Sequence, residues 1–265
     1  ANTVYNNLKD ASASAKVKNQ CMGECLAWKA MAYFFLVRTF GEIPIVHDNS
    51  TMLADGSYSN TQKVAKADVY EYIIMTLEKA MELLPKSSSP GRIDYYSAEA
   101  LLAKVYLTKS GLSANGNGSR NAKDLEKAAM YAKDVITNSG RKLMTNYSDV
   151  FRLQNALNSE ALFSWFWTAD TSVWTVQNTL QSDLGIQGFD EFGDCWGGYN
   201  GPSVDLQEAF GVSPIDNPDD RANVDVRRQA TMMMPGDFYE YFWTDKTDNK
   251  GRKGFNYLQF LYDLS

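Results

Sequence analysis

The chain is poor in residues that support metal binding or nucleophilic catalysis, because its 265 residues include one histidine and three cysteines. The histidine, His47, is followed by Asp48, but neighbouring residues of an extended segment point to opposite faces, so we expect no catalytic dyad. Cys21 and Cys25 lie one helical turn apart, a spacing poorly suited to a disulfide. The sequence also lacks a glycine-rich phosphate loop, a metalloprotease motif and a calcium loop. We therefore expect no metal, no cofactor and no catalytic residue.

A basic excess is also absent, because 26 lysines and arginines face 32 aspartates and glutamates, for a formal net charge of −6. Nucleic acids are bound through basic residues that neutralise phosphates, so this balance argues against a nucleic-acid partner. No apolar run is long enough to span a bilayer, and no signal peptide is present. The chain starts without methionine and stops after an apolar run, so we expect both ends of a longer protein to be missing.

What is present in the first half of the sequence is helical periodicity. Apolar residues recur at helical spacing in four stretches that glycine or proline closes. The stretches are Lys18–Phe40, Ala67–Leu84, Ser97–Ser110 and Asp124–Asn138. We expect Asp68 to cap the second helix. The sequence therefore predicts a mostly α fold.

The first of these helices is apolar on two rows. The rows are Trp28, Ala32, Phe35 and Leu36, and Ala30, Tyr33, Val37 and Phe40. A helix of this kind requires neighbours on more than one side, so we expect the inner helix of a helical array. Gly41 is expected to end the helix and Pro44 to block its continuation. We expect this helix to be scaffold that does not touch a ligand.

The third and fourth helices have the pattern of a tetratricopeptide hairpin, with small residues where the two helices of such a repeat meet. The first helix contributes Glu99, Leu102, Ala103 and Tyr106, and the second contributes Ala128, Ala132 and Val135. A helical hairpin of another kind remains an alternative. We expect tetratricopeptide-like hairpins over residues 1–160 that support long irregular binding loops, with little β structure, in residues 161–265.

The second half changes in character. Residues 161–168 form an apolar run typical of a strand, and Trp165 and Trp167 alternate on it, so we expect one of its faces to be core. Residues 169–202 show no period and are rich in Gly, Asp, Asn and Gln, which is typical of loops that carry function. A short helix capped by Ser203 is predicted after them.

Four of the six tryptophans lie between Trp165 and Trp196. Aromatic rings can stack on the apolar faces of sugars, and nearby amides and carboxylates can bond the hydroxyl groups. Ligand contact is therefore predicted for Trp174, Gln177, Asn178, Asp194, Trp196, Tyr199, Asn200 and, from another loop, Tyr58. The alternative for each ring is that it packs the loop onto the helices.

Carboxylates in the same region leave a glycosidase open as a third hypothesis, because glycoside hydrolysis uses a pair of acidic residues. The candidates are Asp183, Asp190, Glu191 and Asp194. No motif places two of them across a sugar, so we expect an acidic exposed loop and no enzyme.

Several stretches resemble the SusD/RagB family of outer-membrane nutrient-binding lipoproteins of Bacteroidota, in the order in which the family has them. They are AWKAMAYFFLVRTFGEIPIV (27–46), RIDYYSAEALLAKVYLTKSG (92–111), KAAMYAKDVITNSGRKLMTNYSDVFR (127–152) with SEALFSW (159–165), and GPSVDLQEAF (201–210) with DVRRQATMM (225–233). The family's lipidated N-terminal part and its C-terminal portion are not in this chain.

The resemblance implies a lipid-anchored protein at the outer-membrane surface. It implies capture of oligosaccharides or polysaccharides, or of peptides, and transfer to a SusC-type TonB-dependent transporter without cleavage. A helical-repeat adaptor that binds a protein or peptide and no glycan is the alternative hypothesis.

Overall fold

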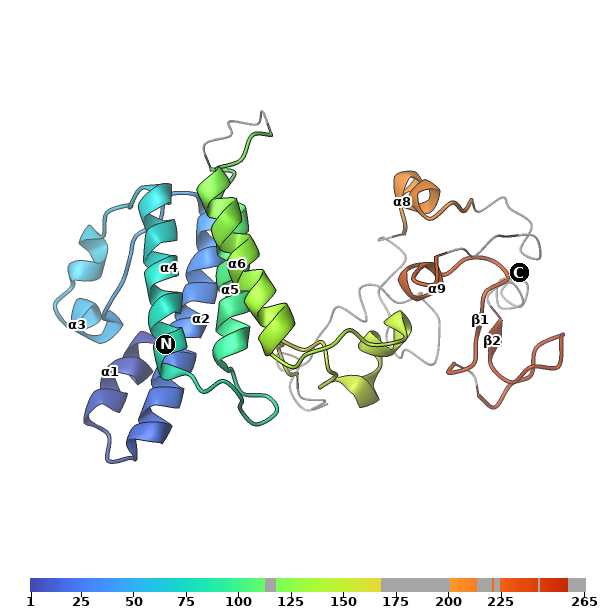
Figure 1. Cartoon of the computed structure of the whole chain (residues 1–265), viewed down its shortest axis with the longest axis horizontal. Coiled ribbons are helices and arrows are strands. Elements are labelled where there is room, and N and C mark those ends of the chain that lie inside the picture. Colours follow the sequence, from blue (N-terminus) through green and yellow to red (C-terminus); the bar gives the residue numbers. More distant parts are fainter. Residues whose placement is uncertain (113–117, 168–200, 214–220, 222–224, 243, 257–265) are drawn as a thin grey trace. The chain divides into compact units, whose positions relative to one another are not determined.

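The computed structural model describes residues 1–112, 118–167, 201–213, 221, 225–242 and 244–256, and it divides the chain into two compact units (Figure 1). The helical unit consists of residues 1–143 and 157–165, and the second unit consists of residues 144–156 and 166–265. Predictions that fall on residues 168–200 lie outside the described part of the chain. The boundary predicted at residue 160 stays a prediction.

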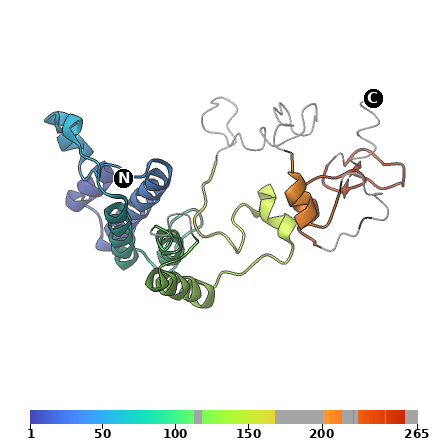
Figure 2. The same ribbon diagram turned by 90° about the horizontal axis from the view of Figure 1, so that it is seen from above.

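The helical unit is a succession of helices that pack on their sequence neighbours (Figures 1 and 2). The elements are α1 (Asn2–Asp10), α2 (Ala15–Phe40), α3 (Asn49–Ala54), η1 (Ser57–Asn60), α4 (Lys66–Leu83), α5 (Tyr95–Lys109) and α6 (Ala122–Asn138). Helix α1 packs on α2, α2 on α4, α4 on α5, and α5 on α6. The predicted mostly α fold is confirmed.

The core of this unit lies where α2, α4 and α5 meet. Its buried residues recur at helical spacing along each helix. They include Leu26, Ala27, Ala30, Phe34 and Val37 of α2, Val69, Tyr70, Ile73 and Leu77 of α4, and Leu102 and Val105 of α5. Gly23 lets α2 approach the end of α4, because a Cβ atom at this position would lie 2.7 Å from the Leu84 side chain.

The opposite face of α2 differs from the expectation. Among the described residues, Phe35 and Leu36 are exposed, at 52% and 41%, and Phe40 is 69% exposed. Tyr33, Val37 and Ala30 of the other row are buried as predicted. Sequence periodicity places apolar residues on a face, but it does not supply the neighbour that covers them. Gly41, with a positive φ of 77°, ends the helix as predicted.

The helical hairpin of α5 and α6 has its small residues at the contact. Ala103 and Ala128 are buried, and the rings of Tyr106 and Tyr131 stack across the two helices with centroids 5.8 Å apart. Lys109 of α5 bonds the Asp124 carboxylate of α6 at 2.8 Å. The repeat-like packing predicted for this hairpin is therefore present.

The helix ends were predicted less well. Asp68 lies within the first turn of α4, whose N-cap is Ala65, so its assignment as the cap was wrong. Asp48 caps α3, since its carboxylate accepts hydrogen bonds from the amides of Ser50 and Thr51. This use of the carboxylate agrees with the prediction that Asp48 forms no dyad with His47.

In its described part, the second unit contains only short helices and strands. They are η2 (Tyr147–Phe151), η3 (Leu153–Asn155), α8 (Val204–Ala209), α9 (Arg228–Thr231), β1 (Phe238–Tyr239) and β2 (Phe255–Asn256). The two strands pair antiparallel, with Phe238 opposite Asn256. Ser203 caps α8 as predicted, accepting a hydrogen bond from the amide of Leu206. The only sheet in the described residues is this pair.

Glu99 is a buried acid in the α5–α6 hairpin. Glu99 is 2% exposed, and its Oε2 atom has no hydrogen-bond partner among the described residues. Burial raises the pKa of Glu99 to about 7, and the negative charge of Asp134 on α6 adds to the rise, while Lys86 and Tyr95 oppose it. A carboxyl group in this position stays protonated where it would ionise in the unfolded chain.

We predict that Glu99 makes stability fall as the pH rises. The folded pKa of about 7 lies above the ordinary value of 4.5, so the folded state holds one more proton between these values, and stability is lost across that interval. Glu99→Gln should remove this loss and make the chain more stable by about 3 kcal/mol at pH 8. Urea unfolding from pH 4 to pH 8 measures the difference.

The matched control is Glu126→Gln, which removes an exposed acid of α6. If the free energies of unfolding of the wild type and of Glu99→Gln change with pH in parallel, Glu99 is ionised in the folded state over this range.

Candidate functional site

An aromatic cluster on the helical unit brings two exposed tryptophans together with a partly buried phenylalanine. Trp28 of α2 meets Phe163 at 5.0 Å and Trp165 at 5.2 Å between ring centroids, and both pairs are nearly perpendicular, at 83°. Phe163 also packs against the helical core. Trp28 is 38% exposed and Trp165 is 57% exposed. One ring of the cluster therefore contacts the core, and the other two are exposed to solvent.

The segment that carries Phe163 and Trp165 is not a strand, and this corrects the sequence prediction for residues 161–167. Trp165, Phe166 and Trp167 are all about half exposed, whereas Phe163 packs against the helical core. Apolar alternation predicts that one face of a segment is buried, but single large rings are also found at protein surfaces. The sequence predicted that one face of the run is core without saying which, and Trp165 lies in the exposed cluster.

A polar clamp around Asp94 holds this segment in place. The buried Asp94 carboxylate caps α5 by accepting hydrogen bonds from the Ser97 amide at 2.9 Å and the Ser97 hydroxyl at 2.8 Å. Arg141 donates to the other carboxylate oxygen at 2.9 Å and to the Ala161 carbonyl at 2.7 Å. The Ser97 hydroxyl oxygen also lies 2.6 Å from the Leu162 carbonyl oxygen, so Asp94 and the Leu162 carbonyl compete for its one proton. Residues 161 and 162 are therefore tied to the start of α5.

A charged pair lies one helical turn before Trp28. Glu24 receives two hydrogen bonds from Arg92, from Nε and from Nη2, each at 2.7 Å. Gln20 lies 3.5 Å from the same carboxylate. The bidentate pair is partly exposed, with 45% of the Arg92 side chain open to solvent. The aromatic cluster thus has planar polar groups beside it.

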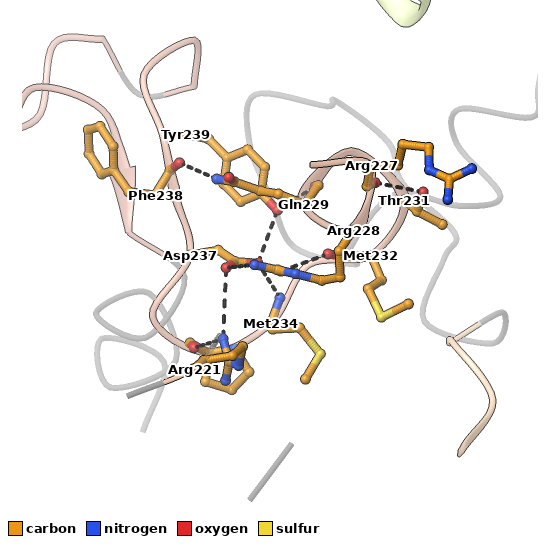
Figure 3. Close-up of polar contacts among 11 residues, drawn as sticks. Arg221, Arg227, Arg228, Gln229, Thr231, Met232, Met234, Asp237, Phe238 and Tyr239 are labelled. Atoms are coloured by element: carbon orange, nitrogen blue, oxygen red, sulfur yellow. Dashed lines mark hydrogen bonds and ion pairs between the residues drawn. The ribbon is translucent and has the colours of Figure 1, made fainter. Parts of the chain in front are cut away.

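A buried arginine–aspartate cluster organises the second unit (Figure 3). The Arg228 guanidinium binds both oxygens of Asp237, and its Nη2 lies 2.8 Å from Oδ1. Arg221 lies beside the same carboxylate, with Nη1 3.8 Å from Oδ1 and 2.9 Å from the Pro235 carbonyl. All three side chains are almost fully buried. Two guanidinium groups therefore share one carboxylate.

The same aspartate fixes the local backbone and one ring. Asp237 accepts a hydrogen bond from the Met234 amide at 2.8 Å, and the Tyr239 hydroxyl lies 3.3 Å from it. Met232 and Met234 pack beside the cluster with Val212 in a small apolar core. These contacts satisfy the buried carboxylate in the way a structural group requires. We assign this cluster to the fold of the second unit.

The structure tests little of the predicted ligand set. Seven of its residues lie outside the described part of the chain, namely Trp174, Gln177, Asn178, Asp194, Trp196, Tyr199 and Asn200. Tyr58 lies on η1 and is 57% exposed. Its role in ligand binding stays a prediction. The carboxylates Asp183, Asp190 and Glu191 also lie outside the described part.

The single histidine has a structural environment. His47 Nδ1 lies 3.5 Å from the Tyr72 hydroxyl, and the two rings meet edge to face. Within the described ranges, no group of histidine, cysteine and acidic residues is placed to hold a metal ion. None of the described helices is both long and apolar enough to cross a bilayer.

The sequence analysis missed Trp28 as a member of the aromatic cluster and Arg141 as a member of the Asp94 clamp. Trp28 was assigned to the inner row of α2, and a signal was available in Glu24, which puts a charge on the same face one turn earlier. Arg141 gives no signal of this kind, because its partners at positions 94 and 161 are far apart in the sequence.

Residues 1–107 match a SusD-like family model described as starch-binding and associating with the outer membrane. A SusD-like protein of Bacteroides ovatus is 35% identical over 245 residues, which are 91% of this chain and 42% of that protein. The resemblance predicted from the sequence is confirmed. The chain spans less than half the length of this relative.

Solved structures give the same result. A crystal structure containing a xylogluco-oligosaccharide matches with a TM-score of 0.77 and 32% identity, over 96% of this chain and 47% of that one. A laminarin-binding SusD-like protein matches with a TM-score of 0.51 and 25% identity, over 61% of this chain and 33% of that one.

We predict that Arg141→Met releases residues 157–165 from the helical unit. The variant leaves the buried Asp94 carboxylate without its cationic partner, at a cost of about 2 kcal/mol. Hydrogen exchange of residues 157–165 should become faster, and tryptophan emission should shift to longer wavelength. Lys142→Met is the matched control, because Lys142 is the next residue in the chain and its side chain is exposed. Equal exchange in both variants would contradict the clamp.

We predict that Asp237→Asn destabilises the second unit by about 3–5 kcal/mol, because it leaves two buried guanidinium groups without a counter-charge. Hydrogen exchange of residues 225–242 reports this unit directly. The control is Asp225→Asn, which breaks the exposed pair with Arg227 and should cost far less stability, because solvent screens an exposed ion pair. If both variants lose a similar amount of stability, burial of the arginine–aspartate cluster does not stabilise the second unit.

Proposed function

We propose, from the premise that this chain is related to the SusD-like family, that it captures glycans at the cell surface. The observation that carries the proposal is the match, over 96% of the chain, to a structure that contains a xylogluco-oligosaccharide. The laminarin-binding relative adds support, because its ligand is also a neutral glucan. The expected ligand is therefore an uncharged oligosaccharide.

Stacking on aromatic rings is the proposed mode of capture. Tryptophan and tyrosine faces present an apolar surface to the C–H groups of a pyranose, while amide and carboxylate groups bond its hydroxyls. The proposed contacts are Trp174, Gln177, Asn178, Asp194, Trp196, Tyr199 and Asn200, with Tyr58. The chain is proposed to bind without cleaving, because no pair of carboxylates is identified as an acid and a nucleophile.

The proposed setting is the outer membrane, in agreement with the description of the family model that residues 1–107 match. We propose a lipid anchor outside this sequence and a SusC-type TonB-dependent transporter that receives the glycan. Neither nucleic acid nor a cofactor has a part in this proposal.

The alternative is an adaptor that binds a protein or peptide through its helices. The exposed Phe35, Leu36 and Phe40 on α2 favour it, because exposed apolar residues on one helix are typical of protein-binding surfaces. This alternative requires that the loop tryptophans take no part in binding.

Calorimetric titration with xylogluco-oligosaccharide and laminarin oligosaccharide tests the proposal. The wild type should bind at least one of them, and the double variant Trp174→Ala with Trp196→Ala should weaken binding about tenfold or more, equivalent to about 1.4 kcal/mol. Leu153→Ala, which removes a 90% exposed side chain of η3, should leave the affinity unchanged.

Absence of binding to either glucan and to a wider polysaccharide panel, together with binding to peptides, would favour the adaptor. Release of reducing sugar that Asp194→Asn abolishes would identify a hydrolase instead.

A further inference from the structure

The aromatic cluster of Trp28, Phe163 and Trp165 is fixed in position and yet open to solvent. Phe163 anchors it in the core, and the Asp94 clamp holds the backbone that carries Trp165. Trp165 nevertheless remains 57% exposed. Large exposed aromatic surface is unfavourable in water, so a rigid exposed ring of this size is typical of a contact surface.

Rigid rings bind with a smaller entropic cost than mobile ones, because they are not ordered at the moment of binding. Trp28 and Trp165 lie nearly perpendicular at 5.2 Å, and Phe163 meets Trp28 at the same angle. Phe163 and Trp165 lie two positions apart in the chain, and both rings meet Trp28. The surface therefore exists before any ligand arrives.

The polar groups beside the rings suit hydroxyl groups. Glu24 lies four residues before Trp28, which is about 6 Å along the helix axis. Its partner Arg92 uses Nε and Nη2 for the carboxylate, and Nη1 has no hydrogen-bond partner among the described residues. Carboxylate oxygens and guanidinium N–H groups accept from and donate to sugar hydroxyls.

The local charge favours a neutral ligand. Glu24 and Arg92 neutralise each other, and the ammonium group of Lys29 lies 5.3 Å over the Tyr72 ring, away from the cluster side of the helix. Burial lowers the pKa of Lys29, in agreement with its covered position. A surface without net charge gives no electrostatic advantage to an anionic ligand.

We propose that Trp28, Trp165, Glu24 and Arg92 form a glycan contact on the helical unit, which stacks and hydrogen-bonds one neutral pyranose unit. This inference rests on the glycan-binding function proposed above and adds a contact to it. It reverses the sequence-based expectation that α2 is scaffold that touches no ligand.

Titration of the chain with xylogluco-oligosaccharide, and with laminarin oligosaccharide if the first does not bind, tests the contact. Trp165→Ala and Trp28→Ala should each raise Kd about tenfold, and Arg92→Gln should raise it several-fold. Phe40→Ala is the matched control, an exposed aromatic on the same helix twelve residues from Trp28, and its Kd should stay within twofold of the wild type.

A second measurement follows ligand binding on the wild-type chain. Variants are used in it only to assign the signals. With 5-fluorotryptophan incorporated, the signals of Trp28 and Trp165 are assigned from Trp28→Phe and Trp165→Phe. Both signals should shift on addition of the oligosaccharide, and the shift should saturate at the Kd found by titration.

The outcomes separate this inference from the function on which it rests. A wild type that binds no glycan overturns the proposed function and this contact together. A wild type that binds, with unchanged affinity in the Trp28 and Trp165 variants and no shift of their fluorine signals, overturns the contact alone.

Discussion

The buried carboxylate of Asp94 is the point on which the organisation of the helical unit depends. One of its oxygens caps α5, and the other binds Arg141, which also donates to the backbone of Ala161. A buried carboxylate is costly unless its oxygens are satisfied, so the cap, the arginine and the returning segment form together or not at all. Phe163 and Trp165 reach Trp28 because this segment is held.

The second unit uses the same physical device in a different place. Asp237 is buried between Arg228 and Arg221, and it also accepts from the backbone of Met234. The described elements around it are short, so they offer few backbone hydrogen bonds to hold one another. A buried, multiply bonded carboxylate can fix such irregular chain where helix packing cannot.

The aromatic cluster and the α2 face show that apolar residues of one helix serve different purposes. Ala27, Ala30 and Val37 are buried against α4, whereas Trp28 is partly open and has polar neighbours in Glu24 and Arg92. Phe35 and Leu36 are exposed as well, and exposed apolar residues on one helix are typical of a surface that meets another apolar surface.

Several elements were predictable because their signals are local. The lengths of α2, α5 and α6, the cap of α8 at Ser203 and the stop at Gly41 all follow from neighbours within a few residues. The cap of α4 was assigned to the wrong residue, since Asp68 satisfies the pattern one turn too late. The strand predicted at residues 161–168 is absent from its described part, 161–167, because apolar alternation does not distinguish a strand from an irregular segment that side chains tie in place.

By itself the sequence determined the mostly helical fold, the repeat-like hairpin and the relationship to SusD-like proteins, because helical periodicity and family motifs are properties of neighbouring residues. Only the tertiary structure decided that Trp28 and Trp165 meet at an open surface and that Arg141 holds them there. Arg141 joins residues 47 and 20 positions away, and Trp28 and Trp165 lie more than a hundred positions apart. Hydrogen bonding and burial, which no local pattern encodes, select them.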